Sequence, residues 1–206
     1  MLLPTSCPIC LHPGPAPCAA CIAGLRRAPN LPPPAPVDVV HALLAYDGGG
    51  RELVARLKYR NARASVPWLG EHLAALVRLA GTTVDVVTWV PTTVERRRDR
   101  GFDQAELLAR AVARPLRLPC RSLLDRRPGP AQTGRSAAER RAGPRISARR
   151  GRAPERVLLV DDVLTTGATA AAAARALRAA GTEFVAAAVA ARTPLGRTRQ
   201  EYPATL

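Results

Sequence analysis

The stretch of the chain with the clearest chemistry places two adjacent carboxylates before a short loop of threonine and glycine. Asp161 and Asp162 follow the apolar run Val157–Val160, whose short β-branched pattern predicts a buried parallel strand. The loop after them opens an alanine-rich helix and comprises Thr165, Thr166, Gly167, Ala168 and Thr169. Backbone N–H groups at a helix N-terminus favour a phosphate, and paired carboxylates bind vicinal hydroxyls directly or through a divalent cation. The stretch therefore predicts a site for a ribose 5-phosphate compound.

Two other interpretations of this stretch need no such ligand. A receiver domain also places paired acids after an apolar strand, but it needs a later aspartate, and none follows Asp162. An ordinary strand-to-helix turn capped by Asp and Thr remains an alternative. One cap does not require two acids and three threonines around a glycine, so we favour the ligand site.

Four cysteines near the start of the chain form a second candidate site. They make two Cys-x-x-Cys pairs separated by seven residues, namely Cys7, Cys10, Cys18 and Cys21. Four thiolates at this spacing suit tetrahedral zinc in a compact double knuckle, whereas a redox dithiol or fortuitous cysteines are the alternatives. A closed four-sulfur site leaves no position for substrate. We therefore expect a structural zinc that supplies the folding free energy of a unit too small for its own core.

The acid-and-threonine stretch resembles the phosphoribosyl pyrophosphate-binding motif of type I phosphoribosyltransferases. That motif is an apolar strand followed by Asp-Asp-x-x-Thr-Thr-Gly-x-Thr, and it matches this chain at every acidic and phosphate-loop position. The resemblance implies that Asp161 and Asp162 hold the ribose hydroxyls and that Thr165 to Thr169 hold the 5-phosphate.

Further segments resemble the ComF family, phosphoribosyltransferase-like proteins with an N-terminal four-cysteine module. They are Leu57-Lys58-Tyr59, Val90-Pro91, Arg100-Gly101-Phe102-Asp103-Gln104-Ala105 and Leu107-Leu108-Ala109. By this resemblance the arginine-rich loop after Val90 holds pyrophosphate, and Arg100 is the best candidate to stabilise charge on that leaving group. The alternative for Arg96 to Arg98 is a solvated charged turn. The family commonly has Asn where this chain has Asp103, which still suits a helix cap.

A mobile loop closes over the reacting centre of type I enzymes, and the comparable place here is residues 126–143. Ser136 to Glu139 forms a capping box that predicts a short helix ending at Gly143. The family-like positions in this stretch are Gln132, Arg135 and Arg140. Gly143 replaces the family's usual Asn.

The resemblance implies a protein that binds phosphoribosyl pyrophosphate with Mg²⁺. In the implied reaction a nitrogen nucleophile attacks the anomeric carbon of the ribose as pyrophosphate leaves, and Mg²⁺ and arginines offset the charge. The sequence does not identify the acceptor. Two alternatives stay open: a competence-associated accessory in DNA uptake, which would bind nucleic acid or competence proteins, and a sensor of phosphoribosyl pyrophosphate without turnover.

Composition bounds these hypotheses. A chain of 206 residues, 47% of them hydrophobic, is long enough for one α/β domain and a small appendage. The net charge of +15 suits an anionic ligand or nucleic acid, but the use of Arg, with Lys58 the only lysine, also fits a GC-rich genome. The first ten residues lack the pattern of a secretory signal, and no run of residues reaches the length of a membrane span. We therefore expect a cytoplasmic protein with reduced thiols.

Strand and helix periods alternate from Val37 to Ala191 and predict a mainly parallel sheet flanked by helices. We expect strands at Val37–Tyr46, Val84–Val90, Arg121–Leu124, Val157–Val160 and Glu183–Ala191. We expect helices at Arg51–Tyr59, Pro67–Ala80, Gly101–Ala113 and Thr169–Ala180. On this pattern His72 is a packed core histidine and Cys120 a small buried residue.

A proline-rich stretch, Pro29–Pro36, predicts a semi-rigid extended linker. The expected organisation is a zinc module at 1–28, the linker at 29–36 and a phosphoribosyltransferase-like domain at 37–206. The sequence leaves open the oligomeric state and the roles of Cys120 and Lys58.

Overall fold

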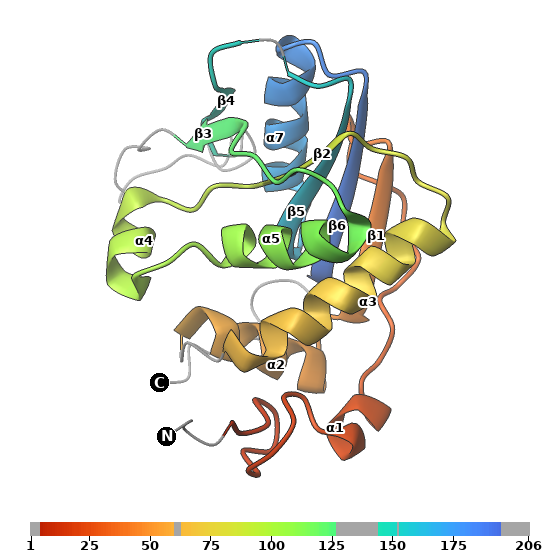
Figure 1. Cartoon of the computed structure of the whole chain (residues 1–206), viewed down its shortest axis with the longest axis vertical. Coiled ribbons are helices and arrows are strands. Elements are labelled where there is room, and N and C mark those ends of the chain that lie inside the picture. Colours follow the sequence, from red (N-terminus) through yellow and green to blue (C-terminus); the bar gives the residue numbers. More distant parts are fainter. Residues whose placement is uncertain (1–4, 60–62, 127–143, 152, 195–206) are drawn as a thin grey trace.

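The chain folds around a sheet of four parallel strands, and the structure, a computed structural model, describes residues 5–59, 63–126, 144–151 and 153–194. From one edge to the other the strands are β1 (Val39–Ala45), β6 (Phe184–Arg192), β5 (Arg156–Leu164) and β2 (Val86–Trp89) (Figure 1). Each pairing between neighbours in this sheet is parallel. The predicted parallel α/β sheet is confirmed.

Helices cover both faces of the sheet. One face carries α2 (Gly48–Tyr59), α3 (Val66–Leu79) and α5 (Gln104–Leu116). The other face carries α7 (Ala168–Ala179). Leu158 and Val160 of β5 pack in the first core, whereas Val157 and Leu159 pack in the second. Successive side chains of a strand point to opposite faces, so a strand covered on both sides must be apolar throughout.

Smaller elements surround this sheet. They are α1 (Ala19–Ala23), the 3₁₀ turn η1 (Arg63–Ser65), α4 (Val94–Arg100), β3 (Leu124–Arg126) and β4 (Ile146–Ala148). β3 and β4 pair in antiparallel fashion, and Leu124 and Ile146 pack with the core under α7. The helix predicted at 136–143, with Gln132, Arg135 and Arg140, lies outside the described residues. Among the residues that are described, no helix has the length and apolar character to cross a membrane.

The strand that carries the two acids is longer than predicted. We expected it to end at Val160, but β5 continues through Asp161 and Asp162 to Leu164. β6 pairs with β5 as far as Leu164, whereas β2 ends opposite Val160. The pairing with β6 therefore keeps the two acids in extended backbone. Beyond Val160, the other edge of β5 has no paired strand in the described sheet, so loops can lie beside it.

The arginine-rich stretch after Val90 is mostly helical, where we expected a loop. α4 occupies Val94–Arg100, and Glu95 in its first turn suits the positive end of the helix dipole. The loop between β2 and α4 is consequently short and centres on residues 91–93.

Two side chains are more exposed than predicted. The buried stripe of α3 runs through Leu69, Leu73 and Val77, and His72 lies outside it on the surface. The His72 ring stacks on Trp68 with 4.2 Å between ring centroids. Cys120 is half-buried, and burial raises the pKa of its thiol. A raised pKa disfavours the thiolate, which agrees with the expectation that Cys120 is no nucleophile.

Candidate functional site

The carboxyl edge of the sheet brings three predicted segments together. Trp89 pairs with Val160, and the Val90 N–H donates to the Val160 carbonyl at 3.0 Å. The chain therefore leaves β2 at the level of Asp161. Farther along β5 the chain turns through residues 165–167 into α7. In parallel α/β sheets this edge is where ligands bind.

Both predicted acids are half-buried at this edge. The Asp161 Oδ1 atom accepts a hydrogen bond from the Asp162 N–H at 2.8 Å, which orients the first carboxylate. Two adjacent carboxylates of this kind are suitable oxygen ligands for Mg²⁺ or for ribose hydroxyls. Their roles remain predictions, but their position beside the loop after β2 fits one ligand that reaches both segments.

The predicted phosphate loop lies at the N-terminus of α7. Thr165 and Thr166 are exposed, and Gly167 occupies the N-cap position with φ +78°. The Ala168 N–H lies 3.4 Å from the Thr166 Oγ1 atom. A glycine cap has no side chain to accept from the first-turn N–H groups, so these groups suit an anion. The arrangement fits the predicted 5-phosphate site.

The proline-rich segment packs on this loop, a contact that sequence reasoning missed. Arg192 is buried at the end of β6, and it donates to the carbonyl oxygens of Leu31 and Pro32 at 2.7 and 2.5 Å. Burial lowers the pKa of the Arg192 guanidinium. A Cβ atom at Gly167 would lie 2.5 Å from the Cβ of Pro34. The segment expected to be a spacer thus contacts the candidate site directly.

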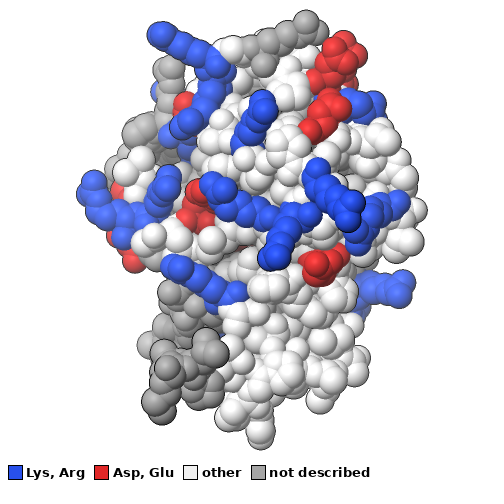
Figure 2. Space-filling model, viewed as in Figure 1, with Lys and Arg blue, Asp and Glu red and all other residues white. Residues whose placement is uncertain are grey.

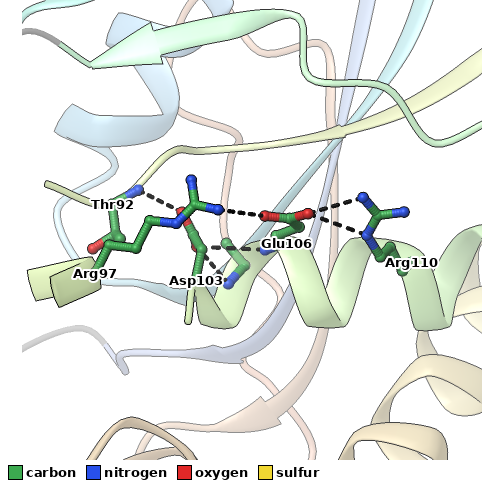
Figure 3. Close-up of polar contacts among 6 residues, drawn as sticks. Thr92, Arg97, Asp103, Glu106 and Arg110 are labelled. Carbon is green, nitrogen blue, oxygen red and sulfur yellow. Dashed lines mark hydrogen bonds and ion pairs between the residues drawn. The ribbon is translucent and has the colours of Figure 1, made fainter. Parts of the chain in front are cut away.

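The loop after β2 is tied to α5 through a single carboxylate (Figure 3). Asp103 is the N-cap of α5, and its Oδ1 accepts from the N–H groups of Ala105 and Glu106 at 3.0 and 3.4 Å. Its Oδ2 accepts from the Thr92 N–H at 2.9 Å. Burial raises the pKa of Asp103, although these N–H donors oppose the shift. The predicted helix cap is confirmed, and the bond to Thr92 is additional.

Arginines lie on both sides of this loop. Arg126, at the end of β3, donates from Nη1 to the Pro91 carbonyl at 3.4 Å, a role for which the sequence had no signal. Arg97 and Arg110 both face Glu106, at 3.9 and 2.9 Å (Figure 3). The predicted residue Arg100 ends α4, but its side chain lies outside the described part of the structure, so its role stays a prediction.

The four predicted cysteines form one cluster. Their sulfur atoms all lie within 4.8 Å of one another, and those of Cys10 and Cys18 are 3.8 Å apart. Zinc–sulfur bonds of about 2.3 Å require sulfur separations of about 3.8 Å in a tetrahedron. The donor set and its spacing therefore fit zinc.

Electrostatics within the cluster also favour a cation. Burial of Cys7 opposes its ionisation, but backbone N–H groups, including those of Ile9 and Cys18 at 3.5 Å, lower its pKa to about 6. Burial, hydrogen bonds that the Cys21 thiol donates to the other cysteine sulfurs, and the charge of Cys7 raise the pKa of Cys21 to about 12. One thiolate thus suppresses ionisation of its neighbour, and a divalent cation would reverse this effect.

The cysteine module is docked on the main sheet domain. Ile9 and Leu25 pack against the core beside α2, where a Cβ at Gly49 would lie 3.1 Å from the Leu25 Cδ2 atom. Arg26 forms an ion pair with Asp47 at 2.8 Å. Figure 1 shows the arrowheads of β1 and β6 directed toward the end of the molecule that holds α1. The module therefore lies toward the same side as the carboxyl edge.

Comparison with known proteins identifies the family of the chain. The family model described as the phosphoribosyl transferase domain matches residues 102–205. Competence protein ComFC of Bacillus subtilis (strain 168) is 28% identical over 139 residues, a match that covers 66% of this chain and 56% of that protein. The chain thus spans little more than half the length of this relative.

Solved structures show weaker likeness. The allosteric regulatory enzyme of purine biosynthesis is 25% identical with a TM-score of 0.44, over 62% of this chain and 26% of that one. The same values hold for glutamine phosphoribosylpyrophosphate amidotransferase from B. subtilis. Adenine phosphoribosyltransferase from Leishmania donovani is 14% identical with a TM-score of 0.33, over 71% of this chain and 73% of that one.

Proposed function

The chain belongs to the phosphoribosyl transferase domain family, and from this premise we propose that it binds phosphoribosyl pyrophosphate with Mg²⁺ and transfers the phosphoribosyl group to a nitrogen acceptor. One observation carries the proposal. The half-buried acids of β5, the N-terminus of α7 and the loop after β2 share one edge of the sheet. A sugar phosphate with a charged group at each end would engage all three.

Each segment has a distinct task in this reaction. Asp161 and Asp162 would hold the ribose hydroxyls and the bound Mg²⁺, and Thr165 to Thr169 would hold the 5-phosphate. The loop after β2, with Arg100 nearby in the chain, would bind the departing pyrophosphate. When bound, Mg²⁺ neutralises charge on the leaving group. The reaction then needs no covalent nucleophile from the protein.

The cysteine module would contribute structure rather than chemistry. We assign it one zinc ion held by Cys7, Cys10, Cys18 and Cys21. Four sulfur ligands close the coordination sphere, so no position remains for substrate. We keep the division into a module at 1–28, a linker at 29–36 and a domain at 37–206 as part of the proposal.

A second candidate function is a nucleic-acid accessory. Figure 2 shows many basic side chains spread across the face that carries α4 and α5, with acidic side chains at several places among them. Among the described side chains, the exposed arginines of these two helices are Arg97, Arg98, Arg110 and Arg114, and Arg117 follows directly. Such a surface suits a phosphate backbone, and its affinity for DNA should fall steeply as salt rises. Binding of a sugar phosphate in the site should depend on salt far less.

Calorimetric titration of phosphoribosyl pyrophosphate, with and without Mg²⁺, tests the main proposal. Changing Asp161→Asn together with Asp162→Asn should abolish recognition of the ribose. Thr166→Val should weaken binding by about 1.5 to 3 kcal/mol, the value of a hydrogen bond to a charged group. Thr83→Val, an exposed threonine before β2, is the matched control and should change nothing.

Two outcomes would overturn or redirect the proposal. If the intact protein binds no phosphoribosyl pyrophosphate, the assignment of the site is wrong. If it binds the ligand but releases no pyrophosphate with any nitrogenous acceptor, the protein is a sensor rather than a transferase.

A further inference from the structure

A single peptide group in the loop after β2 is held from both sides. Its carbonyl, from Pro91, accepts a hydrogen bond from Arg126 at 3.4 Å. Its N–H, from Thr92, donates to the Oδ2 atom of Asp103 at 2.9 Å. The carbonyl and the N–H of a trans peptide point in opposite directions. The two side chains therefore define the orientation of the peptide plane between Pro91 and Thr92.

Asp103 can join a helix and a loop because it has two acceptor oxygens. One oxygen caps α5 through the N–H groups of Ala105 and Glu106, and the other binds Thr92. Asp103 is only 5% exposed, so water does not compete strongly for these bonds. An ionised carboxylate only accepts hydrogen bonds, and it can serve both sides at once.

The element behind Asp103 is rigidly packed. α5 buries Leu108 and Val112 completely in the core that it shares with the sheet. Its Cα atoms lie close to those of β2 and β5, the strands on either side of the opening beside Asp161. Because the loop at residues 91–93 is bound to the start of α5, its position is fixed by the packing of α5 in the core rather than by the loop itself.

We propose that Asp103 is a positioning residue, which orients the Pro91–Thr92 peptide beside Asp161 and so preorganises the loop for the pyrophosphate end of the ligand. This inference rests on the proposed function. It follows because Trp89 pairs with Val160 and the Val90 N–H donates to the Val160 carbonyl, so the chain leaves β2 beside Asp161 and continues into Pro91. Preorganised donors are effective in catalysis because they need no rearrangement when charge develops on the leaving group.

Two substitutions separate positioning from simple helix capping. Asp103→Ser keeps a capping oxygen for α5, but its side chain is too short to reach Thr92 as well. Asp103→Asn keeps the shape but offers one oxygen, so its NH₂ group must face one of the N–H donors. Glu106→Gln is the matched control, because it removes the ion pairs with Arg97 and Arg110 but keeps the backbone N–H that Asp103 caps.

The test measures exchange of the Thr92 amide hydrogen by NMR, together with affinities for pyrophosphate with Mg²⁺ and for ribose 5-phosphate. In Asp103→Ser we expect Thr92 to exchange at least about tenfold faster and pyrophosphate to bind about tenfold more weakly. Ribose 5-phosphate should bind as before, and Asp103→Asn should show the same pattern. Glu106→Gln should change neither the exchange rate nor either affinity.

Unchanged exchange of Thr92 in both Asp103 variants would refute the positioning role. Equal weakening of pyrophosphate and ribose 5-phosphate would also refute it, because it would indicate general destabilisation. Failure of the intact protein to bind either compound would instead refute the proposed function. The two failures are therefore distinguishable in one series of measurements.

Discussion

The two halves of the proposed ligand site are built in different ways. The half for ribose 5-phosphate, from Asp161 to Thr169, lies on one continuous strand, loop and helix. The half for pyrophosphate is assembled from Thr92, Asp103 and Arg126, which come from three separate segments. A continuous site takes its geometry mainly from the backbone that contains it. An assembled site takes it from the packing of elements that are distant in the sequence.

The cysteine module is continuous in the same sense, since its four ligands lie within residues 7–21. It differs in the source of its order, because we propose that a bound zinc ion, together with packing on the sheet domain, takes the place of a core of its own. Substitutions in the two halves of the ligand site and in the cysteine module should therefore have effects that differ in size and in kind.

The largest effect is expected in the module. Cys18→Ser should reduce the zinc content from about one ion per chain to none, because three sulfur ligands do not close the tetrahedron. Structural zinc contributes roughly 10 to 16 kcal/mol of apparent binding free energy in zinc-finger peptides, so most of the module's order should be lost. Elemental analysis of the purified protein measures the metal.

Cys120→Ser is the matched control for this change, because Cys120 is half-buried outside the four-sulfur cluster. It should retain the full zinc content. Zinc that persists in Cys18→Ser would show that the ligands are misassigned.

A smaller effect on stability tests whether the ribose 5-phosphate half of the site depends on its contact with the proline-rich segment. Gly167→Ala should lower the free energy of unfolding by about 2 to 4 kcal/mol, since φ is +78° and the new Cβ would meet Pro34. Gly81→Ala, at φ +62° with open space around it, should cost only about 1 to 2 kcal/mol. Urea denaturation of both variants measures the difference. Equal losses would mean that the proline-rich segment moves away easily, and that the continuous half does not depend on it.

The smallest effect concerns the titration of Asp103. Burial raises its pKa above the ordinary 3.8, so the native chain holds this proton more tightly than the unfolded chain. Between that ordinary value and the raised pKa, the Asp103 contribution to the free energy of unfolding should fall as pH rises. Affinity for pyrophosphate should instead increase as pH rises over this range. At lower pH, protonation of Asp103 removes one of the acceptors that hold the N–H groups of Ala105, Glu106 and Thr92.

Unfolding and pyrophosphate binding measured against pH, for the intact protein and Asp103→Asn, check this prediction. Glu106 and Arg97 are the charged groups nearby, and they are common to both proteins. The pH dependence assigned to Asp103 should disappear in the variant. Identical slopes in the two proteins would contradict it.

By itself the sequence determined the features that depend on neighbouring residues. Unbroken apolar strands indicated a parallel sheet, Asp103 before an amphipathic helix indicated a cap, and paired cysteines indicated a sulfur cluster. These inferences succeed because periodicity, capping and short ligand spacing are local properties of the backbone. The roles of Asp161 and Asp162 come from the same kind of local motif, and they await measurement.

Tertiary structure alone decided the features that depend on which distant segments meet. β5 extends to Leu164 because β6 continues beside it, and Pro34 lies on Gly167 because Arg192 holds the preceding carbonyls. The second oxygen of Asp103 reaches Thr92 only because α5 packs beside the end of β2. Such contacts cannot be predicted from the periodicity of the sequence. Each depends on how whole elements pack together rather than on residues that are neighbours in the chain.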